Sequence, residues 1–128
     1  MSTETTNMST YSKFNSFVEA LAEKAHNLGS DQLKVALTNS APLATNSVLA
    51  NLTEIDYTYC SSRDITTTSS SQTSGTYKLV LEDLVLTATG GSVGPFRYVV
   101  IYNDTASNDE LVGFFDYGSS ITLQAGET

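Results

Sequence analysis

The stretch from residue 94 to residue 116 restricts the fold more strongly than any other part of this sequence. Residues 96–102 form an almost unbroken apolar and β-branched run, which is typical of a strand buried on both faces. Residues 103–110 are rich in Asn, Asp, Ser and Thr, which stabilise turns, and residues 111–116 form a second, shorter apolar run. Two such runs joined by a polar turn predict a β-hairpin, which we expect at the centre of a sheet.

Residues 11–28 carry the clearest helix signal in the chain. Their apolar positions are spaced three and four apart and are Phe14, Phe17, Val18, Leu21, Ala22, Ala25 and Leu28. This spacing predicts an amphipathic α-helix over about 11–28, capped by Thr10 or Ser12 and ended by Gly29. We expect its apolar stripe to cover the sheet rather than to bind a partner helix.

The chain divides into an arm and one domain. Residues 1–10 are expected to form a flexible N-terminal arm, because they are rich in Ser and Thr and lack an apolar anchor. Residues 11–128 suit a single domain, since a chain of 128 residues can bury one core without disulfides or metals.

Several weaker strand signals precede the hairpin. Residues 32–38 alternate between polar and apolar and predict a half-buried strand. Residues 39–51 predict a long irregular connection with a short helical turn near 48–52. Residues 54–65 suit one or two short edge strands.

The middle and the end of the chain are less regular. We expect a strand at 66–68 followed by a Ser/Thr-rich loop. Residues 77–81 and 84–89 favour one strand interrupted by a bulge, with a hairpin as the alternative. After a break at 117–120, residues 121–123 predict a last short strand.

One helix followed by five to eight strands, without βαβ alternation, predicts an α+β protein with a mainly antiparallel sheet. We favour a β-sandwich or partly closed barrel with the N-terminal helix packed on one side. Residues 124–128 have turn chemistry, beyond which we expect a closing strand. Its absence would leave an unpaired sheet edge, unless the chain is incomplete.

The charge balance bears on possible partners. The formal net charge is −8, from 6 basic and 14 acidic residues, so phosphate backbones and anionic membrane surfaces are repelled. We therefore expect neither nucleic acid nor membrane as a partner. The first ten residues lack the pattern of a signal peptide, and no apolar run approaches the ~20 residues of a membrane span. Synthesis in the cytoplasm is the expectation.

The chemistry-bearing residues are few. One cysteine and one histidine cannot supply a zinc cluster; Cys60 is expected to be buried or idle, and His26 to lie at the solvated end of the helix. Asp104, Asp109 and Glu110 cluster in the predicted turn, where calcium is possible, but their spacing lacks the EF-hand pattern and favours a solvated turn. We expect no metal, no cofactor, no catalytic residue and no enzyme activity.

Three segments carry a resemblance to a known family. KVALTNSAP (34–42), SSSQTSGTYKLVLED (69–83) and residues 87–128 resemble small virion structural proteins of tailed bacteriophages and prophages. The resemblance runs from about residue 11 to the end and is densest in GPFRYVVIYND and FFDYGSS. The family brings no catalytic residue to any of these positions.

The resemblance implies a capsid decoration, or cement, protein. Such a protein binds the outer surface of the major capsid protein shell and stabilises it, as a virion component made in the host cytoplasm and as a homo-oligomer (dimer or trimer) on the capsid. A tail or neck subunit, such as a tail-tube or tail-completion protein, is the alternative. A receptor- or glycan-binding virion module is favoured less, because most of the seven tyrosines fall at strand positions typical of a core.

Partner contacts are expected from the arm, the Ser/Thr-rich loops and the open sheet edge. Many weak contacts, multiplied by avidity on a repetitive shell, would hold such a protein in place. The residues that we expect to contribute are Thr3, Thr5, Thr6, Asn7, Leu43, Asn46, Thr68, Ser70 and Glu127.

Overall fold

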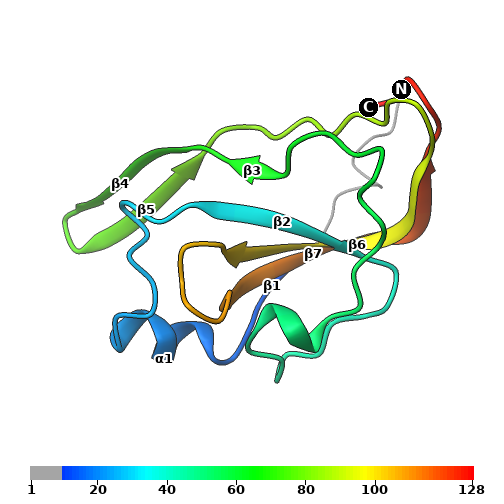
Figure 1. Cartoon of the computed structure of the whole chain (residues 1–128). Coiled ribbons are helices and arrows are strands. Elements are labelled where there is room, and N and C mark those ends of the chain that lie inside the picture. The colour runs from blue at the N-terminus through cyan, green and yellow to red at the C-terminus, as the bar shows by residue number, and fades with distance from the viewer. Residues whose placement is uncertain (1–9) are drawn as a thin grey trace.

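A computed structural model describes residues 10–128 of the chain. The fold is mostly antiparallel β with little helix, built from a five-stranded sheet of order β1-β7-β6-β2-β3 and a two-stranded sheet, β4-β5 (Figure 1). The elements are β1 (Thr10–Lys13), α1 (Phe17–Ala22), β2 (Leu33–Thr38), the 3-10 helix η2 (Leu49–Asn51), β3 (Asp64–Ile65), β4 (Thr67–Thr73), β5 (Thr76–Leu81), β6 (Val93–Asn103) and β7 (Leu111–Leu123). Apolar side chains of both sheets meet in one core cluster, so the arrangement is sandwich-like.

The predicted hairpin at 94–116 is confirmed. β6 and β7 pair antiparallel, and β6 lies in the middle of the sheet between β7 and β2. Val100 is fully buried because both faces of β6 are covered near its centre. The predicted break at 117–120 is wrong, since β7 runs on to Leu123. Gly118 takes a positive φ of 97° there, a conformation that glycine adopts without steric strain, so the strand continues.

The predicted helix over 11–28 is not confirmed. Its first residues form β1, which pairs with β7 from Thr10↔Asp116 to Lys13↔Gly113. The helix α1 covers only Phe17–Ala22. Lys24 has a positive φ of 73°, so the helical conformation ends well before Gly29.

The apolar stripe of that predicted helix does cover the sheet in part. Phe14 is fully buried and its ring lies 5.2 Å from the ring of Phe114, and Tyr11 lies 5.0 Å from Phe115. By contrast, Val18 is 54% exposed and Leu21 40% exposed. The predicted stripe is therefore divided in the structure, with Phe14 in the core and Val18 and Leu21 largely at the surface.

The strand predicted at 32–38 is confirmed as β2, but it is buried on both faces rather than on one. Leu33, Val35 and Leu37 join the cluster between the sheets, while Ala36 joins a second cluster with Phe14 and other residues on the opposite face. The short helical turn predicted near 48–52 is confirmed as η2. It caps this second cluster, since Leu49 and Leu52 pack against it.

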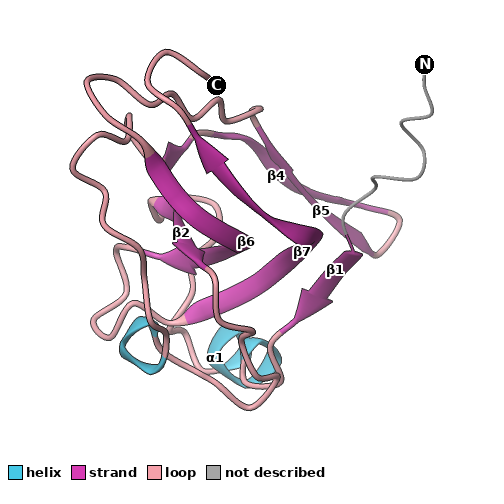
Figure 2. Ribbon diagram, turned by 90° about the vertical axis from the view of Figure 1, so that its right-hand side faces the viewer, coloured by secondary structure: helices cyan, strands magenta, loops and turns pink. Residues whose placement is uncertain are grey.

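The Ser/Thr-rich region differs from its prediction. The expected loop after residue 68 is instead strand, because β4 continues to Thr73 and turns through Ser74 and Gly75 into β5. Residues 84–89 are not a strand; Ala88 alone forms a bridge, to Cys60. The β4–β5 pair extends beyond the end of β2 (Figure 1), and β5 lies on the same side of the molecule as β1 (Figure 2).

Candidate interaction surfaces

The structure does not gather the predicted partner-binding residues into one surface. Thr68 and Ser70 lie on β4, while Glu127 lies in the C-terminal turn, at the opposite end of the molecule (Figure 1). Leu43 and Asn46 lie in the connection between β2 and η2. The four residues predicted in the arm fall outside the described range; they are Thr3, Thr5, Thr6 and Asn7.

Two of these residues, Asn46 and Glu127, already form hydrogen bonds within their own turns. Asn46 Oδ1 accepts the backbone N–H of Leu43 at 2.8 Å, and Asn46 N–H donates to the Leu43 carbonyl at 2.9 Å, which closes the turn. Glu127 Oε1 accepts the N–H of Gln124 at 2.6 Å, and the Glu127 carbonyl accepts the N–H of Ala88 at 3.0 Å. The Leu43 side chain remains exposed.

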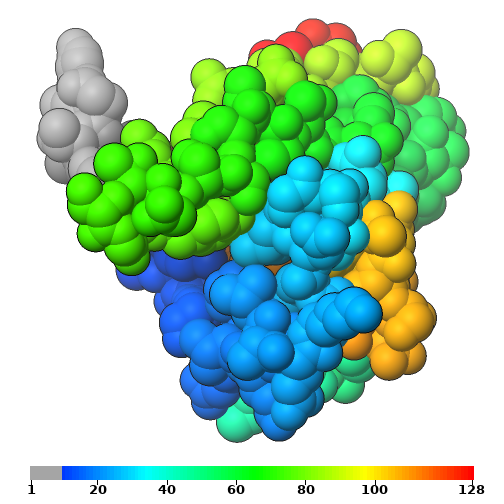
Figure 3. Space-filling view, turned by 90° about the vertical axis from the view of Figure 1, so that its left-hand side faces the viewer, coloured from blue at the N-terminus to red at the C-terminus, as the bar shows by residue number. Residues whose placement is uncertain are grey.

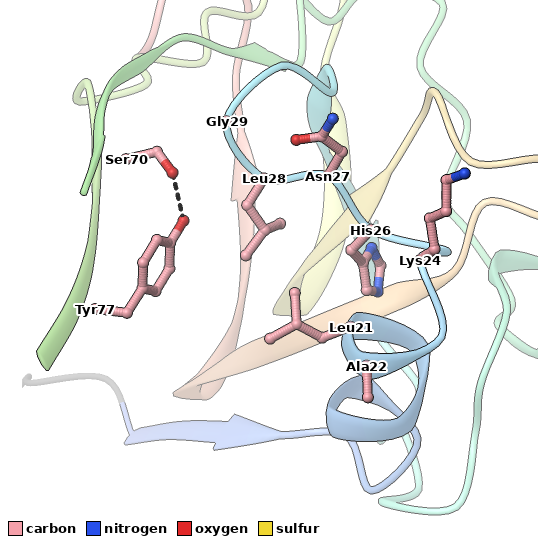
Figure 4. Close-up of a pocket in the computed structure, with 9 residues that line it drawn as sticks. All are labelled: Leu21, Ala22, Lys24, His26, Asn27, Leu28, Gly29, Ser70 and Tyr77. Atoms are coloured by element: carbon pink, nitrogen blue, oxygen red, sulfur yellow. Dashed lines mark hydrogen bonds between the residues drawn. The ribbon is translucent and has the colours of Figure 1, made fainter. Parts of the chain in front are cut away.

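Ser70 borders a cavity of about 500 Å³. Its hydroxyl lies 2.7 Å from the Tyr77 hydroxyl across the β4–β5 pair, as Figure 4 shows. The facing wall comes from α1 and the residues after it, so this cavity separates the β4–β5 pair from the N-terminal part of the domain, and in Figure 3 the green pair lies over the blue segment. The lining residues are Leu21, Ala22, Lys24, His26, Asn27, Leu28, Gly29, Ser70 and Tyr77. We call it the His26 cavity.

His26 is buried rather than solvated, so the expectation of a solvated histidine is wrong. It is 4% exposed, its Nδ1 lies 3.0 Å from Asn103 Nδ2, and its Nε2 has no partner among the residues described. Asn103 Nδ2 also donates to Asp31 Oδ2 at 2.7 Å, and Asn103 Oδ1 accepts the N–H groups of Thr105 and Ala106. These bonds fix the amide orientation, so His26 Nδ1 must accept.

The protonation of His26 follows from this geometry. Burial lowers the pKa of His26 below its usual value of 6.5, and the nearby carboxylates of Glu110 and Asp31 oppose that shift. A neutral ring with its proton on Nε2 is the form that the site accepts. The group joins the residues after α1 to the end of β6.

A second cavity, of about 310 Å³, lies between β5 and β1 and is almost wholly apolar. Tyr11 of β1 and Leu79 and Leu81 of β5 form its two sides, and the sheet forms its floor. The lining residues are Tyr11, Leu33, Leu79, Leu81, Ile101, Val112 and Phe115. We call it the seam. Leu79 and Leu81, two positions apart in the strand run predicted at 77–81, are its only sequence signal, since the other walls come together through the fold.

The residues around Cys60 hold the connection from 54 to 63 in place. Tyr57 hydroxyl accepts the N–H of Leu37 at 2.8 Å and donates to Glu54 Oε1 at 2.7 Å, and the Arg63 guanidinium lies 3.7 Å from the centre of the Tyr57 ring. Burial raises the pKa of Tyr57 and also raises the pKa of the Cys60 thiol, so the reactive thiolate is disfavoured. These contacts fix the connection from 54 to 63 against β2.

Four of the seven tyrosines are exposed, which corrects the expectation that most belong to the core. Their exposed fractions are 48% for Tyr11, 45% for Tyr59, 47% for Tyr77 and 41% for Tyr117. Tyr11 and Tyr77 border the two cavities beside β5, whereas Tyr59 lies against Gly90 and Gly91.

Within residues 10–128, no three His, Cys, Asp or Glu side chains come together in a group that could hold a metal ion. None of the helices in the described range is long and apolar enough to cross a membrane. No protein-family model, curated protein or solved structure matches the chain.

Proposed function

We propose that this protein is a capsid decoration protein, which binds the outer surface of the major capsid protein shell of a tailed bacteriophage and stabilises it. The observation that carries the proposal is the β4–β5 pair. From Ser69 to Thr73, β4 is a Ser/Thr/Gln strand exposed along its length, and the pair reaches beyond the five-stranded sheet (Figure 1). An exposed strand pair of this kind offers backbone and hydroxyl groups to a neighbouring chain.

Two further observations support this function. The resemblance of residues 69–83 to virion structural proteins falls on the exposed pair itself. The exposed surface of β4 itself is uncharged and polar, which suits many weak contacts repeated over a shell. On this proposal the protein is a dimer or trimer in the virion, is made in the host cytoplasm, and has no enzyme activity. The finer architecture that we propose is a β-sandwich.

A tail or neck subunit is the second candidate function. Subunits that assemble into rings also reach their neighbours with extended strands, and the β4–β5 pair is suited to that use. A glycan-binding module receives less support, because its aromatic side chains would have to share one surface. Tyr59 and Tyr77 instead border different regions of the fold.

Fractionation of purified particles tests the proposal. Heads and tails are separated and each is examined by quantitative mass spectrometry. We expect the protein in heads, at a copy number comparable to that of the capsid lattice sites, and heads without it should release DNA at a lower temperature. Recovery in tails alone would favour the tail or neck subunit instead. Absence from both fractions would reject both candidate functions.

The arm is tested on the same particles. Heads stripped of the protein are incubated with the full chain or with a chain that lacks residues 1–10, and bound protein is measured after sedimentation. We expect weaker binding without the arm, since each contact is repeated over the shell. Unchanged binding would contradict the assignment of Thr3, Thr5, Thr6 and Asn7 to the contact.

A further inference from the structure

The outer edge of β4 lacks the protection that exposed strand edges usually carry. Within residues 10–128, β4 pairs only with β5, and no strand pairs with its other side. Natural proteins commonly protect such edges by charged side chains, proline, bulges or a short strand. β1 carries Lys13, β3 has only two residues and β5 carries Lys78, whereas β4 has none of these features over residues 69–73.

The turn between β4 and β5 decides which backbone groups of β4 point outward. Residues 74–75 both have a positive φ, of 52° and 83°, as in the two-residue turns that join hairpin strands. Such a turn makes Thr73 and Thr76 a hydrogen-bonded pair, and bonded pairs alternate with non-bonded pairs along the two strands. The N–H and C=O groups of Ser70 and Gln72 therefore point away from β5, and no backbone partner meets them in the described part of the chain.

The chemistry of β4 narrows the choice of partner. Among the described strands, β4 alone carries no charged residue, although the whole chain has a net charge of −8. Two copies of the chain repel one another, so a contact between them is least unfavourable where both surfaces are uncharged. Hydroxyl and amide side chains both donate and accept hydrogen bonds, so this strand can meet an identical strand without a mismatch. The edge of β4 is complementary to itself.

The bulge at the start of β4 sets the register of such a contact. The pairing with β5 is irregular after Thr67 and regular over residues 69–73, whose centre is Ser71. Two such segments, antiparallel and related by a two-fold axis, place Ser71 against its own copy and Ser70 against Gln72 of the second copy. The outward backbone groups of Ser70 and Gln72 then meet in two bonded pairs, which exchange about four hydrogen bonds.

We propose that β4 pairs with β4 of a second copy of this chain, antiparallel and about a two-fold axis at Ser71. The two hairpins form one sheet of order β5-β4-β4-β5. Lys78 lies opposite Ser71 on β5, so the two copies of Lys78 are three strand spacings apart, roughly 14 Å, which exceeds the Debye length of ~8 Å. The acidic residues nearest to the strand pair are Asp64, Glu82 and Asp83, at its end far from the turn, and in the dimer this end lies toward the uncharged turn of the second copy.

This inference deepens the proposed function, because it names the neighbouring chain that the β4 edge meets, and it rests on that function only for the place where the dimer occurs. The pairing is tested in solution, without particles. If the chain dimerises through β4 but is absent from heads and tails, the pairing stands and both virion functions fail. If the chain is found in heads but stays monomeric in solution, the pairing fails and the decoration function stands.

The contact is small, so the dimer is expected to be weak and reversible. Five residues from each copy bury less than the roughly 1,200 Å² of a stable interface. Sedimentation of the full chain between about 10 μM and about 1 mM, the range of weak association, should show a monomer that is replaced by a dimer. A trimer is not expected, because a two-fold contact is complete with two copies.

Amide hydrogen exchange at low and high protein concentration locates the contact. The N–H groups of Ser70 and Gln72 should exchange more slowly as the concentration rises, because the dimer supplies their missing acceptors. The N–H of Tyr77 is the matched control, since it points outward from the other edge of the same hairpin and should keep its exchange rate. A chain that stays monomeric at about 1 mM, or protection confined to other strands, would overturn the proposal.

Charge variants test the two-fold axis. Ser71→Lys and Ser71→Glu each place like charges directly against one another, so each should weaken the dimer by about threefold to tenfold. An equimolar mixture of the two variants should restore dimerisation, because opposite charges then meet across the axis. Thr76→Lys and Thr76→Glu are the matched controls: they make the same changes on the same strand face but on β5, and should alter the dimer by no more than about twofold. Equal weakening by the controls, or no restoration in the mixture, would show that β4 does not pair with itself at Ser71.

Discussion

Asn103 holds His26 as a neutral hydrogen-bond acceptor: Asn103 Nδ2 lies 3.0 Å from His26 Nδ1 and also donates to Asp31 Oδ2 at 2.7 Å. Both Asn103 and His26 are buried, and they join the segment after α1 to the end of β6. A proton on Nδ1 would place two donors against each other. The hydrogen bond that holds the segment after α1 against β6 therefore depends on a neutral His26 ring.

The unfolding free energy should fall in mild acid because of His26. Its pKa lies below 6.5 in the folded protein through burial, and near 6.5 in the unfolded chain. As the pH falls below 6.5, the unfolded chain takes up the proton first, so stability is lost down to the folded pKa and then levels off. Urea unfolding between pH 8 and pH 5 measures this loss.

An NMR titration of His26 would test this pH dependence directly. His26 is the only histidine in the sequence, so its ring proton signals are unambiguous in an NMR titration. We expect a midpoint below 6.5 and, in a His26→Phe variant, a flatter dependence of the unfolding free energy on pH in this window. A midpoint at or above 6.5 would contradict the buried neutral ring.

Replacement of Asn103 by Leu should destabilise the fold by at least about 2 kcal/mol, because it removes the donor to His26 Nδ1 and one of the donors to Asp31 Oδ2, and leaves the N–H groups of Thr105 and Ala106 without their acceptor. The matched control is Asn108→Ala in the same turn, where the residue is exposed and a change within about 0.5 kcal/mol is expected. Equal effects in urea unfolding would show that the buried network contributes nothing beyond the turn.

The sequence predicted those elements in which one local pattern decides the structure. The hairpin of β6 and β7 was such a case, since two apolar runs and a polar turn have few other uses. The helix predicted over 11–28 was wrong because residues 10–13 pair with β7 instead, which places Tyr11 beside Phe115 and Phe14 beside Phe114. Helix and strand propensities of nearby residues do not predict such a tertiary contact.

The interaction surfaces were harder to predict. β4 has no apolar run, because its Ser and Thr residues pair with β5 through backbone bonds while their side chains face solvent. Ser70 was identified as a candidate and does border a cavity, whereas Asn46 and Glu127 instead close turns. The seam brings together β1, β2, β5, β6 and β7, so only the tertiary fold reveals it.

The structure assigns different roles to two residues of the same predicted helical stripe. Phe14→Ala should cost about 3–5 kcal/mol, since the ring is fully buried against Phe114. Val18→Ala should change the unfolding free energy by no more than about 0.5 kcal/mol, because Val18 is largely exposed on α1. Comparable losses for the two variants would instead favour one continuous helix packed on the sheet.

The connection from 54 to 63 should depend on the hydroxyl of Tyr57. Tyr57→Phe leaves the N–H of Leu37 without its 2.8 Å acceptor beside a buried strand, which should cost about 1–3 kcal/mol of unfolding free energy. Tyr59→Phe is the matched control, since it makes the same chemical change on an exposed ring two residues away and should be nearly neutral. Amide hydrogen exchange locates the effect: the Leu37 N–H should exchange faster in Tyr57→Phe and at its original rate in Tyr59→Phe. An unchanged exchange rate in Tyr57→Phe would mean that the ring, through its contact with Arg63, holds the connection without the hydroxyl.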